Sequence, residues 1–295
     1  MPVWWGGAVA FVYGTVVGSF LNVCIYRLPA EQSIVTPPSH CPKCNTKLKG
    51  VDLVPLFSFL FLGRKCRYCG EPIGWRYFFV ELATGLLFAA AWLRYGLSID
   101  FFVYAAFISA LIVAFAVDLD LFIIPDQVSI VGVVLGLGRD MAHWLAGDVR
   151  ILRTPIPWTD YELPMIPSVA GIVVCGGIFL LIAYVSYYVF RPKDEKELET
   201  YEGAMGGGDV KLAAAIGAVL GILPALAAFL IAVVLGSLFG VALVILKSLR
   251  ERKGMPWRTE IPFGPYLVAG TVTVILAEPQ LRLLWLAWIK FIAPG

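Results

Sequence analysis

The chain has 295 residues, of which 59% are hydrophobic and only 15% are charged. A soluble domain of this size covers its surface with about 25% charged residues. The composition therefore excludes a soluble enzyme and predicts that much of the surface meets lipid. The 23 basic and 21 acidic residues leave a net charge of +2, and this balance argues against a nucleic-acid partner.

Apolar stretches are the next feature, because a helix needs about 20 predominantly apolar residues to cross a bilayer. Eight stretches approach that length and predict an all-α polytopic membrane protein with about eight transmembrane helices. The sixth of them is short. The eight stretches cover residues 5–26, 78–95, 101–117, 128–146, 168–190, 210–223, 225–246 and 264–278.

The distribution of basic residues predicts the orientation. No Lys or Arg precedes Arg27, unlike a cleaved signal peptide, whose basic residues precede its apolar core. Eight spans with the N-terminus outside place residues 27–77, 191–211 and 247–262 on the cytoplasmic side. These segments hold seventeen of the 23 basic residues, in agreement with the positive-inside rule. Residues 147–167 then form an external loop.

Residues 29–77 are the one polar stretch long enough for a small cytoplasmic module. They contain two Cys-x-x-Cys pairs, Cys41 with Cys44 and Cys66 with Cys69, separated by 21 residues. This spacing is close to that of a zinc ribbon. Four thiolates complete a closed tetrahedral Zn²⁺ site, so we expect a structural metal. Two disulfides are the alternative, which a cytoplasmic location disfavours. Basic neighbours that would offset the thiolate charge are Lys43, Lys47, Lys65 and Arg67.

Two aspartates lie at the predicted cytoplasmic boundary of the membrane: Asp118 ends the third span and Asp209 begins the sixth. Ionisable groups at membrane segments are costly and are therefore candidate functional residues. Two carboxyl groups held close together share a proton, so that one acts as a base on water and the other as an acid toward a peptide carbonyl. The alternative is a solvated carboxylate at a helix end, and it has more weight for Asp120 and Asp126, which lie in a turn, than for Asp118 and Asp209.

A glycine run, Gly206 to Gly208, directly precedes Asp209. Glycines allow the backbone to approach a substrate strand closely or to adopt a positive φ. The run is not a Walker loop, because no Gly-Lys-Ser/Thr follows it. Lys211 is expected to bind a lipid phosphate or the substrate carbonyl, or else to extend its amine to the membrane surface.

With these residues in hand, the chain resembles the bacterial prepilin peptidases, which are bifunctional leader peptidases and N-methyltransferases. The resemblance extends over nearly the whole chain, and its Gly-x-Gly-Asp motif is shared with presenilin-type intramembrane proteases. The matching motifs are Gly18-Ser19-Phe20-Leu21-Asn22, the two cysteine pairs, Trp75-Arg76-Tyr77 with Glu81, Asp118-x-Asp120-x4-Pro125-Asp126, Gly206-x-Gly208-Asp209 and Pro262-Phe263-Gly264-Pro265.

The resemblance implies an activity at the cytoplasmic face of a bacterial inner membrane. The chain would cut the basic leader from type IV prepilins or pseudopilins, after a glycine and before a phenylalanine. Asp118 and Asp209 would be the catalytic residues. The supporting residues would be Asp120, Asp126, Gly206, Gly208, Lys211 and Glu81.

The resemblance also implies that the new N-terminal amine is methylated with S-adenosylmethionine. We expect this reaction where the module of residues 29–77 meets the membrane helices. Glu81 would face the cofactor or the amine there, or else be a buried carboxylate at a helix end. The expected organisation is a first transmembrane helix at 1–28, the zinc module at 29–77 and a membrane peptidase core at 78–295.

Two other classes of function compete with this interpretation. A transporter would use Asp118, Asp140 and Asp209 as a cation path. Transporter sites lie near mid-membrane, however, whereas Asp118 and Asp209 are predicted at one face. A non-catalytic zinc-ribbon scaffold would leave the aspartates and the glycine run without a role.

Overall fold

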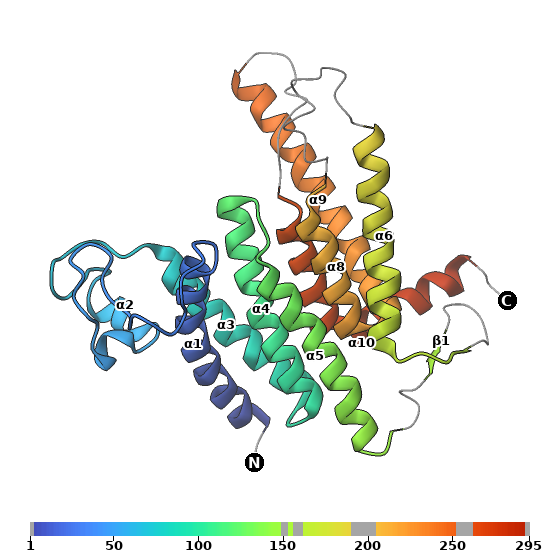
Figure 1. The fold of residues 1–295 in the computed structure, drawn as a ribbon, viewed down its shortest axis with the longest axis horizontal. Coiled ribbons are helices and arrows are strands. Elements are labelled where there is room, and N and C mark those ends of the chain that lie inside the picture. Colours follow the sequence, from blue (N-terminus) through green and yellow to red (C-terminus); the bar gives the residue numbers. More distant parts are fainter. Residues whose placement is uncertain (1–2, 149–152, 156–161, 190–204, 252–261, 293–295) are drawn as a thin grey trace. The chain divides into compact units, whose positions relative to one another are not determined.

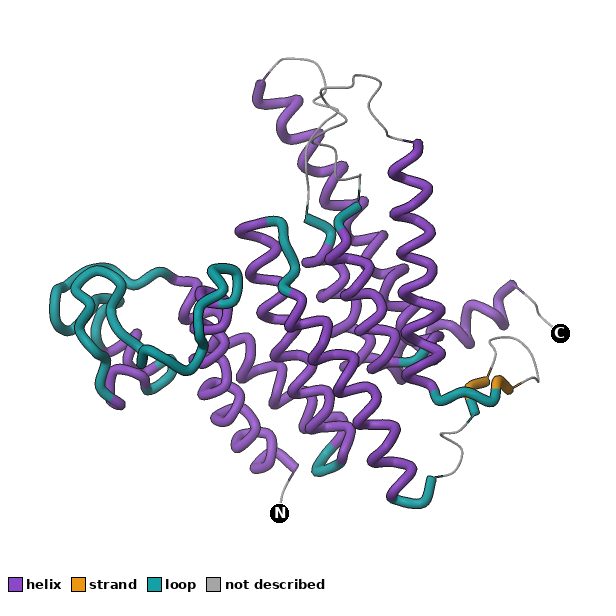
Figure 2. The backbone as a smooth tube through the Cα atoms, in the orientation of Figure 1, coloured by secondary structure: helices purple, strands orange, loops and turns teal. Residues whose placement is uncertain are grey.

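The structure is a computed structural model that describes residues 3–148, 153–155, 162–189, 205–251 and 262–292. Most of the described chain is helical (Figure 2), and its strands are one antiparallel pair of two-residue strands, β1 Thr154–Pro155 and β2 Glu162–Leu163. The predicted all-α class is therefore confirmed. The chain divides into two compact units, Met1–Val117 and Asp118–Gly295.

All eight apolar stretches form helices. Within the described residues, six helices are long and apolar enough to cross a membrane. Two are shorter: α8, Gly207–Leu220, and the apolar part Gly264–Ala277 of α10, Gly264–Ile292. A multi-pass membrane protein is thus confirmed, while the count of eight spans stays a prediction. The six long helices are α1 Val3–Arg27, α3 Trp75–Tyr95, α4 Ile99–Leu121, α5 Asp126–Leu145, α6 Pro167–Val189 and α9 Ile222–Glu251.

In the first unit, α1 and α3 pack closely through glycines. A side-chain carbon added at Gly14 would lie 2.8 Å from the Cα of Gly85, and one added at Gly18 would lie 2.7 Å from the Cα of Glu81. Small residues let membrane helices approach each other in this way. Asn22 adds a hydrogen bond, because its Nδ2 donates to the carbonyl oxygen of Tyr77 at 3.2 Å. The opening motif of the sequence therefore joins α1 to the start of α3.

The module lies between α1 and α3 in sequence and consists mostly of loops (Figure 2). It contains a short 3₁₀ helix, η1 Gly50–Leu53, and one helical turn, α2 Phe57–Phe61. Two isolated antiparallel bridges, His40 with Lys47 and Lys65 with Pro72, each enclose one Cys-x-x-Cys pair. Both cysteine pairs are therefore held in tight reversals of the chain.

In the second unit, α8 packs against α5 and α6. The backbones of Gly171 in α6 and Gly217 in α8 are in contact, and Gly136 in α5 touches the backbone of Ala218. Leu212 and Ile216 of α8 are fully buried. With about 1.5 Å of rise per residue, 14 residues span only ~21 Å, less than the ~30 Å apolar core of a bilayer. Protein rather than lipid therefore surrounds most of α8.

The same unit gives Asp140 a structural role. Its side chain is buried in α5, and its Oδ2 accepts a hydrogen bond of 2.8 Å from the backbone N–H of Ser168 in the first turn of α6. The first N–H groups of a helix have no partner inside the helix, and a carboxylate there also offsets the positive helix end. Asp140 thus caps α6, which gives no support to the cation path of the transporter alternative.

The close contact of α6 with α8 yields the first prediction. In Gly171→Val the new side chain would collide with the backbone of Gly217, which cannot move aside as a side chain can. We expect the free energy of unfolding to fall by about 2–3 kcal/mol, measured by denaturation in detergent micelles. Gly177→Val in the same helix is the matched control, because a side-chain carbon there meets no atom within 4 Å. Equal stability of the two variants would contradict the packing argument.

Candidate active site and metal centre

Asp118 lies in the last turn of α4 and is buried, with 5% of its surface exposed. Its Oδ2 atom has no hydrogen-bond partner among the described residues. The helix ends at Leu121, and Phe122 adopts a left-handed backbone with φ 58°. A non-glycine residue rarely adopts this conformation. The reversal leads through Ile124 to Pro125, which precedes α5.

Asp209 is the third residue of α8, whose N-cap is Gly206. A side-chain carbon added at Gly208 would lie 3.1 Å from the Cβ of Ile124. Glycine is therefore needed there for close approach. The other suggested reason for the glycine run was wrong, because none of its three residues has a positive φ. The contact brings the first turn of α8 to the loop that follows Asp118.

The two aspartates are close enough for the charge of Asp118 to act directly on the carboxyl group of Asp209. A third segment completes their surroundings. The backbone N–H of Gly264 interacts with the Asp118 carboxyl, and a side-chain carbon on Gly264 would lie 2.5 Å from Asp118 Oδ2. The motif at residues 262–265 thus has a physical role, since its glycine makes room for the buried carboxyl group.

The other polar residues of this region lie on the surface. Asp126, in the first turn of α5, accepts an ion-pair contact of 2.6 Å from the amine of Lys211, and both side chains are more than half exposed. Asp120 is exposed and points to a different environment from the buried Asp118. Lys211 thus joins the beginnings of α5 and α8, a role that the sequence alone did not suggest.

The fit of Gly264 against Asp118 leads to the second prediction. In Gly264→Ala the new methyl group collides with a carboxyl group, which can rotate away. We expect a large loss of catalytic activity with little loss of stability, because the carboxyl group moves while the backbone stays. Activity and unfolding are to be measured on the same preparation. Gly138→Ala, where the added carbon meets no atom within 4 Å, is the control. A fully active Gly264→Ala would contradict this assignment.

The four predicted cysteine ligands come together in the module. Their sulfur atoms all lie within 4.8 Å of one another, and those of Cys41 and Cys69 are 3.9 Å apart. Sulfurs at ~2.3 Å from a tetrahedral zinc would be about 3.8 Å apart, so the cluster fits such an ion. Hydrogen bonding to the Thr46 hydroxyl and backbone lowers the pKa of the Cys44 thiol to about 6. A thiolate, the form that binds metal, is thereby favoured.

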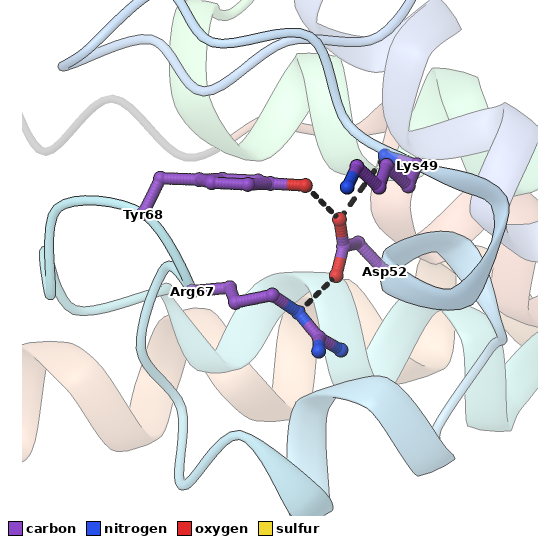
Figure 3. A network of polar contacts seen from close by, with 4 residues as sticks. All are labelled: Lys49, Asp52, Arg67 and Tyr68. Atoms are coloured by element: carbon purple, nitrogen blue, oxygen red, sulfur yellow. Dashed lines mark hydrogen bonds and ion pairs between the residues drawn. The ribbon is translucent and has the colours of Figure 1, made fainter.

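A network around Asp52 supports the second cysteine pair (Figure 3). The Asp52 carboxylate accepts hydrogen bonds from Arg67 Nε at 2.6 Å and from the Tyr68 hydroxyl at 2.8 Å. It also accepts one from the backbone N–H of Lys49 at 3.0 Å. Arg67 and Tyr68 are the two residues between Cys66 and Cys69, so Asp52 holds that turn in place. The sequence alone suggests Arg67 only as a counter-charge to the thiolates and gives no signal for the role of Asp52.

The electrostatics of Asp52 follow from these partners. Burial acts to raise the pKa of this carboxyl group, since only 3% of the side chain is exposed. The hydrogen bonds from Lys49, Tyr68 and Arg67, together with the Arg67 charge, outweigh burial and lower the pKa below its ordinary value. A carboxyl group with a lowered folded-state pKa stabilises the fold above its unfolded pKa of about 3.9. That contribution is lost as the pH falls through the lowered value.

The third prediction concerns metal retention by the module. Elemental analysis first identifies the metal, and the chelator concentration that removes half of it is then measured for the intact protein and for Asp52→Asn. At pH 6–7 we expect the variant to release metal at a lower chelator concentration. The difference should shrink as the pH falls from about 3.9 through the lowered pKa of Asp52, because the wild-type carboxylate becomes protonated there as well. Glu71→Gln, an exposed carboxylate of the same module, is the control. A difference that does not depend on pH would contradict this account.

Glu81 joins the module to the α1–α3 pair. It is buried in α3, and its Oε2 accepts a hydrogen bond of 2.8 Å from the backbone N–H of Leu56. The Ser19 side chain of α1 also hydrogen-bonds to Glu81. Leu56 has φ 60°, a strained conformation for a branched residue. The carboxylate thus holds three segments together at the predicted junction.

Comparison with known proteins identifies the class. The model of the bacterial peptidase A24 N-terminal domain matches residues 12–95, and that of the type IV leader peptidase family matches residues 105–241. The chain belongs to the type IV leader peptidase family. No solved structure shows significant similarity to it.

Curated relatives extend this result over most of the chain. A protein of Bacillus subtilis (strain 168) named prepilin leader peptidase/N-methyltransferase is 32% identical over 91% of this chain and 93% of its own length. A protein of the same name from Myxococcus xanthus (strain DK1622) is 33% identical over 80% of this chain and 62% of its own length. One from Burkholderia pseudomallei (strain 1026b) is 31% identical, with 94% and 87% covered.

Proposed function

We propose that this membrane protein cleaves the leader peptide of type IV prepilins or pseudopilins and then N-methylates the new N-terminal residue. The observation that carries the proposal is the meeting of Asp118 and Asp209 at the adjoining ends of α4 and α8. Membership in the type IV leader peptidase family supports it. So do relatives whose name includes both activities.

For cleavage, we assign Asp118 and Asp209 as an aspartate dyad that shares one proton. One carboxylate takes a proton from water while the other gives its proton to the peptide carbonyl. The unpartnered Oδ2 of Asp118 suits such a role, because a buried acceptor without a partner is costly unless function requires it. The site of cleavage, after a glycine and before a phenylalanine, is part of the proposal.

The remaining predicted residues are proposed to support the dyad. Gly206 is the N-cap of α8, and Gly208 allows the close approach of this helix to Ile124. The ion pair of Lys211 with Asp126 holds the beginnings of α8 and α5 together, and Asp120 lies exposed beside the buried Asp118. We propose that the ion pair positions Asp209. We also propose that Asp120 acts on the substrate leader indirectly, through the surrounding solvent.

Methyl transfer is proposed to take place where the module meets α1 and α3, with S-adenosylmethionine as the methyl donor. The buried Glu81, held by Leu56 and Ser19, is proposed to maintain this junction. We propose the corresponding organisation: a first transmembrane helix at 1–28, a metal module at 29–77 and a peptidase core at 78–295.

We propose that the metal is Zn²⁺ and that it is structural. The ligand set of Cys41, Cys44, Cys66 and Cys69 leaves no open coordination position for a substrate. The proposed orientation has the N-terminus outside and the module in the cytoplasm of a bacterial inner membrane. The seventeen basic residues of the three segments support this orientation. The expectation that no nucleic acid takes part depends on the balanced charge alone.

The fourth prediction tests the dyad and the order of the two reactions. Asp118→Asn or Asp209→Asn should lower leader cleavage by at least about 10²-fold, because an amide can neither accept nor hold the shared proton. The double variant should be little worse than either single one, since the pair acts as a unit. Mass spectrometry of a full-length prepilin, incubated with each variant and S-adenosylmethionine, measures both reactions.

A pre-cleaved peptide beginning with phenylalanine is the complementary substrate. The amine exists only after cleavage, so both variants should fail on the full-length prepilin but still methylate this peptide. Asp148→Asn, an exposed carboxylate at the end of α5, is the control and should cleave normally. Cleavage at a near wild-type rate by Asp209→Asn would refute the dyad. Ion flux through vesicles without any cleavage would favour a transporter instead.

A further inference from the structure

The single turn α2 exposes an unusual amount of apolar surface for a part of the module outside the membrane helices. Phe57, Leu60 and Phe61 are 61%, 59% and 84% exposed, respectively. Their spacing of three and four residues places them on one face of the turn. Phe59 points the other way and is buried. Large apolar groups gathered on one face mark an interaction surface.

The buried side of α2 fixes its position next to a membrane helix. The Phe59 ring lies 5.4 Å from the ring of Trp75 and 5.3 Å from that of Phe78, between ring centroids. Both partners are in the first turn of α3, which is long and apolar enough to span the membrane. Figure 1 draws α2 beside the α1–α3 pair and not as an extension of it. The turn is therefore close to the level at which α3 enters the bilayer.

The lipid-facing side of α3 leads directly to this turn. Trp75, Phe79, Leu86 and Leu93 are 50%, 58%, 55% and 59% exposed. Intervals of four, seven and seven residues place them on one side of the helix. The Trp75 and Phe79 rings are 5.9 Å apart, so the apolar strip of α3 is continuous with the aromatic contacts of α2. A tryptophan at such a boundary is typical of the membrane interface.

Basic side chains follow the apolar turn immediately. The Arg64 guanidinium lies 5.1 Å from the centre of the Trp75 ring, and Lys65 is exposed. Residues 27–77 contain eight basic and only three acidic residues. One of those three, Asp52, is already paired with Arg67. The charge next to α2 is therefore complementary to anionic lipid headgroups.

We propose that α2 docks the module onto the membrane. Phe57, Leu60 and Phe61 insert into the interfacial layer of the leaflet that α3 enters, while Arg64 and Lys65 contact lipid phosphates. The occupant of this surface is phospholipid, because the surface continues the lipid-facing side of α3 and carries a matching charge. The module is then held at the bilayer at two places, through Glu81 on α3 and through α2 on the lipid.

Photo-crosslinking in nanodiscs that contain phosphatidylglycerol tests this proposal. The photoreactive residue p-benzoylphenylalanine replaces Phe61 in the full chain and, in a second variant, Phe57. After irradiation, the protein is analysed by mass spectrometry. We expect an adduct with the mass of the phospholipid from both positions. Val35, 77% exposed in another loop of the module, is the control position and should give a several-fold lower yield of this adduct.

A second arm tests the basic residues. Lys65→Gln should lower the adduct yield from Phe61 several-fold in phosphatidylglycerol but little in phosphatidylcholine, and Lys47→Gln is its control. Metal content confirms that each variant is folded. An adduct with a second copy of the chain or with added prepilin in place of lipid would refute the proposal. So would a lipid yield at positions 57 and 61 no higher than at 35.

Discussion

The fourteen residues of α8 rise only ~21 Å, less than the ~30 Å apolar core of a bilayer, yet they carry Asp209, and this constraint organises the second unit. A short helix with lipid around it would expose its polar ends to hydrocarbon, where unsatisfied backbone groups are costly. Here Gly171 contacts Gly217, and Gly136 contacts Ala218. At both places the backbone of a neighbouring helix touches the backbone of α8. The first turn of α8 is thereby fixed inside protein, and its aspartate is fixed with it.

Glycines also allow close contacts at the candidate active site. Gly208 admits Ile124, and Gly264 admits the carboxyl group of Asp118. A side chain at Gly264 would collide with the Asp118 carboxyl group, and one at Gly208 would press on Ile124, in the loop that follows Asp118. For the proposed dyad, small displacements of the carboxyl groups would cost large factors in rate. The cap that Asp140 forms on α6 serves the same end, because it fixes the helix against which α8 packs.

Much of this architecture could be predicted from the sequence. Eight apolar stretches predicted eight helices, and the spacing of four cysteines predicted their cluster. The partners of single side chains could not be predicted. The local sequence around Asp52, Asp140 and Lys211 does not reveal their partners, because these partners lie in segments distant in sequence. The pairing of Lys211 with Asp126 joins residues 85 positions apart, a contact that no local pattern encodes.

The division of the chain bears on how two reactions coexist in it. Every residue that builds the proposed dyad, from Asp118 through Ile124 and Asp209 to Gly264, lies in the second unit. The N-terminal family domain, at residues 12–95, contains instead the four-cysteine cluster, the buried Glu81 and the apolar turn α2. The four-cysteine cluster and the carboxylate that fixes its module to a membrane helix are structural features of this domain. Methylation needs an amine that cleavage alone creates, so the methyl transfer proposed for the N-terminal domain must follow the hydrolysis proposed for the second unit.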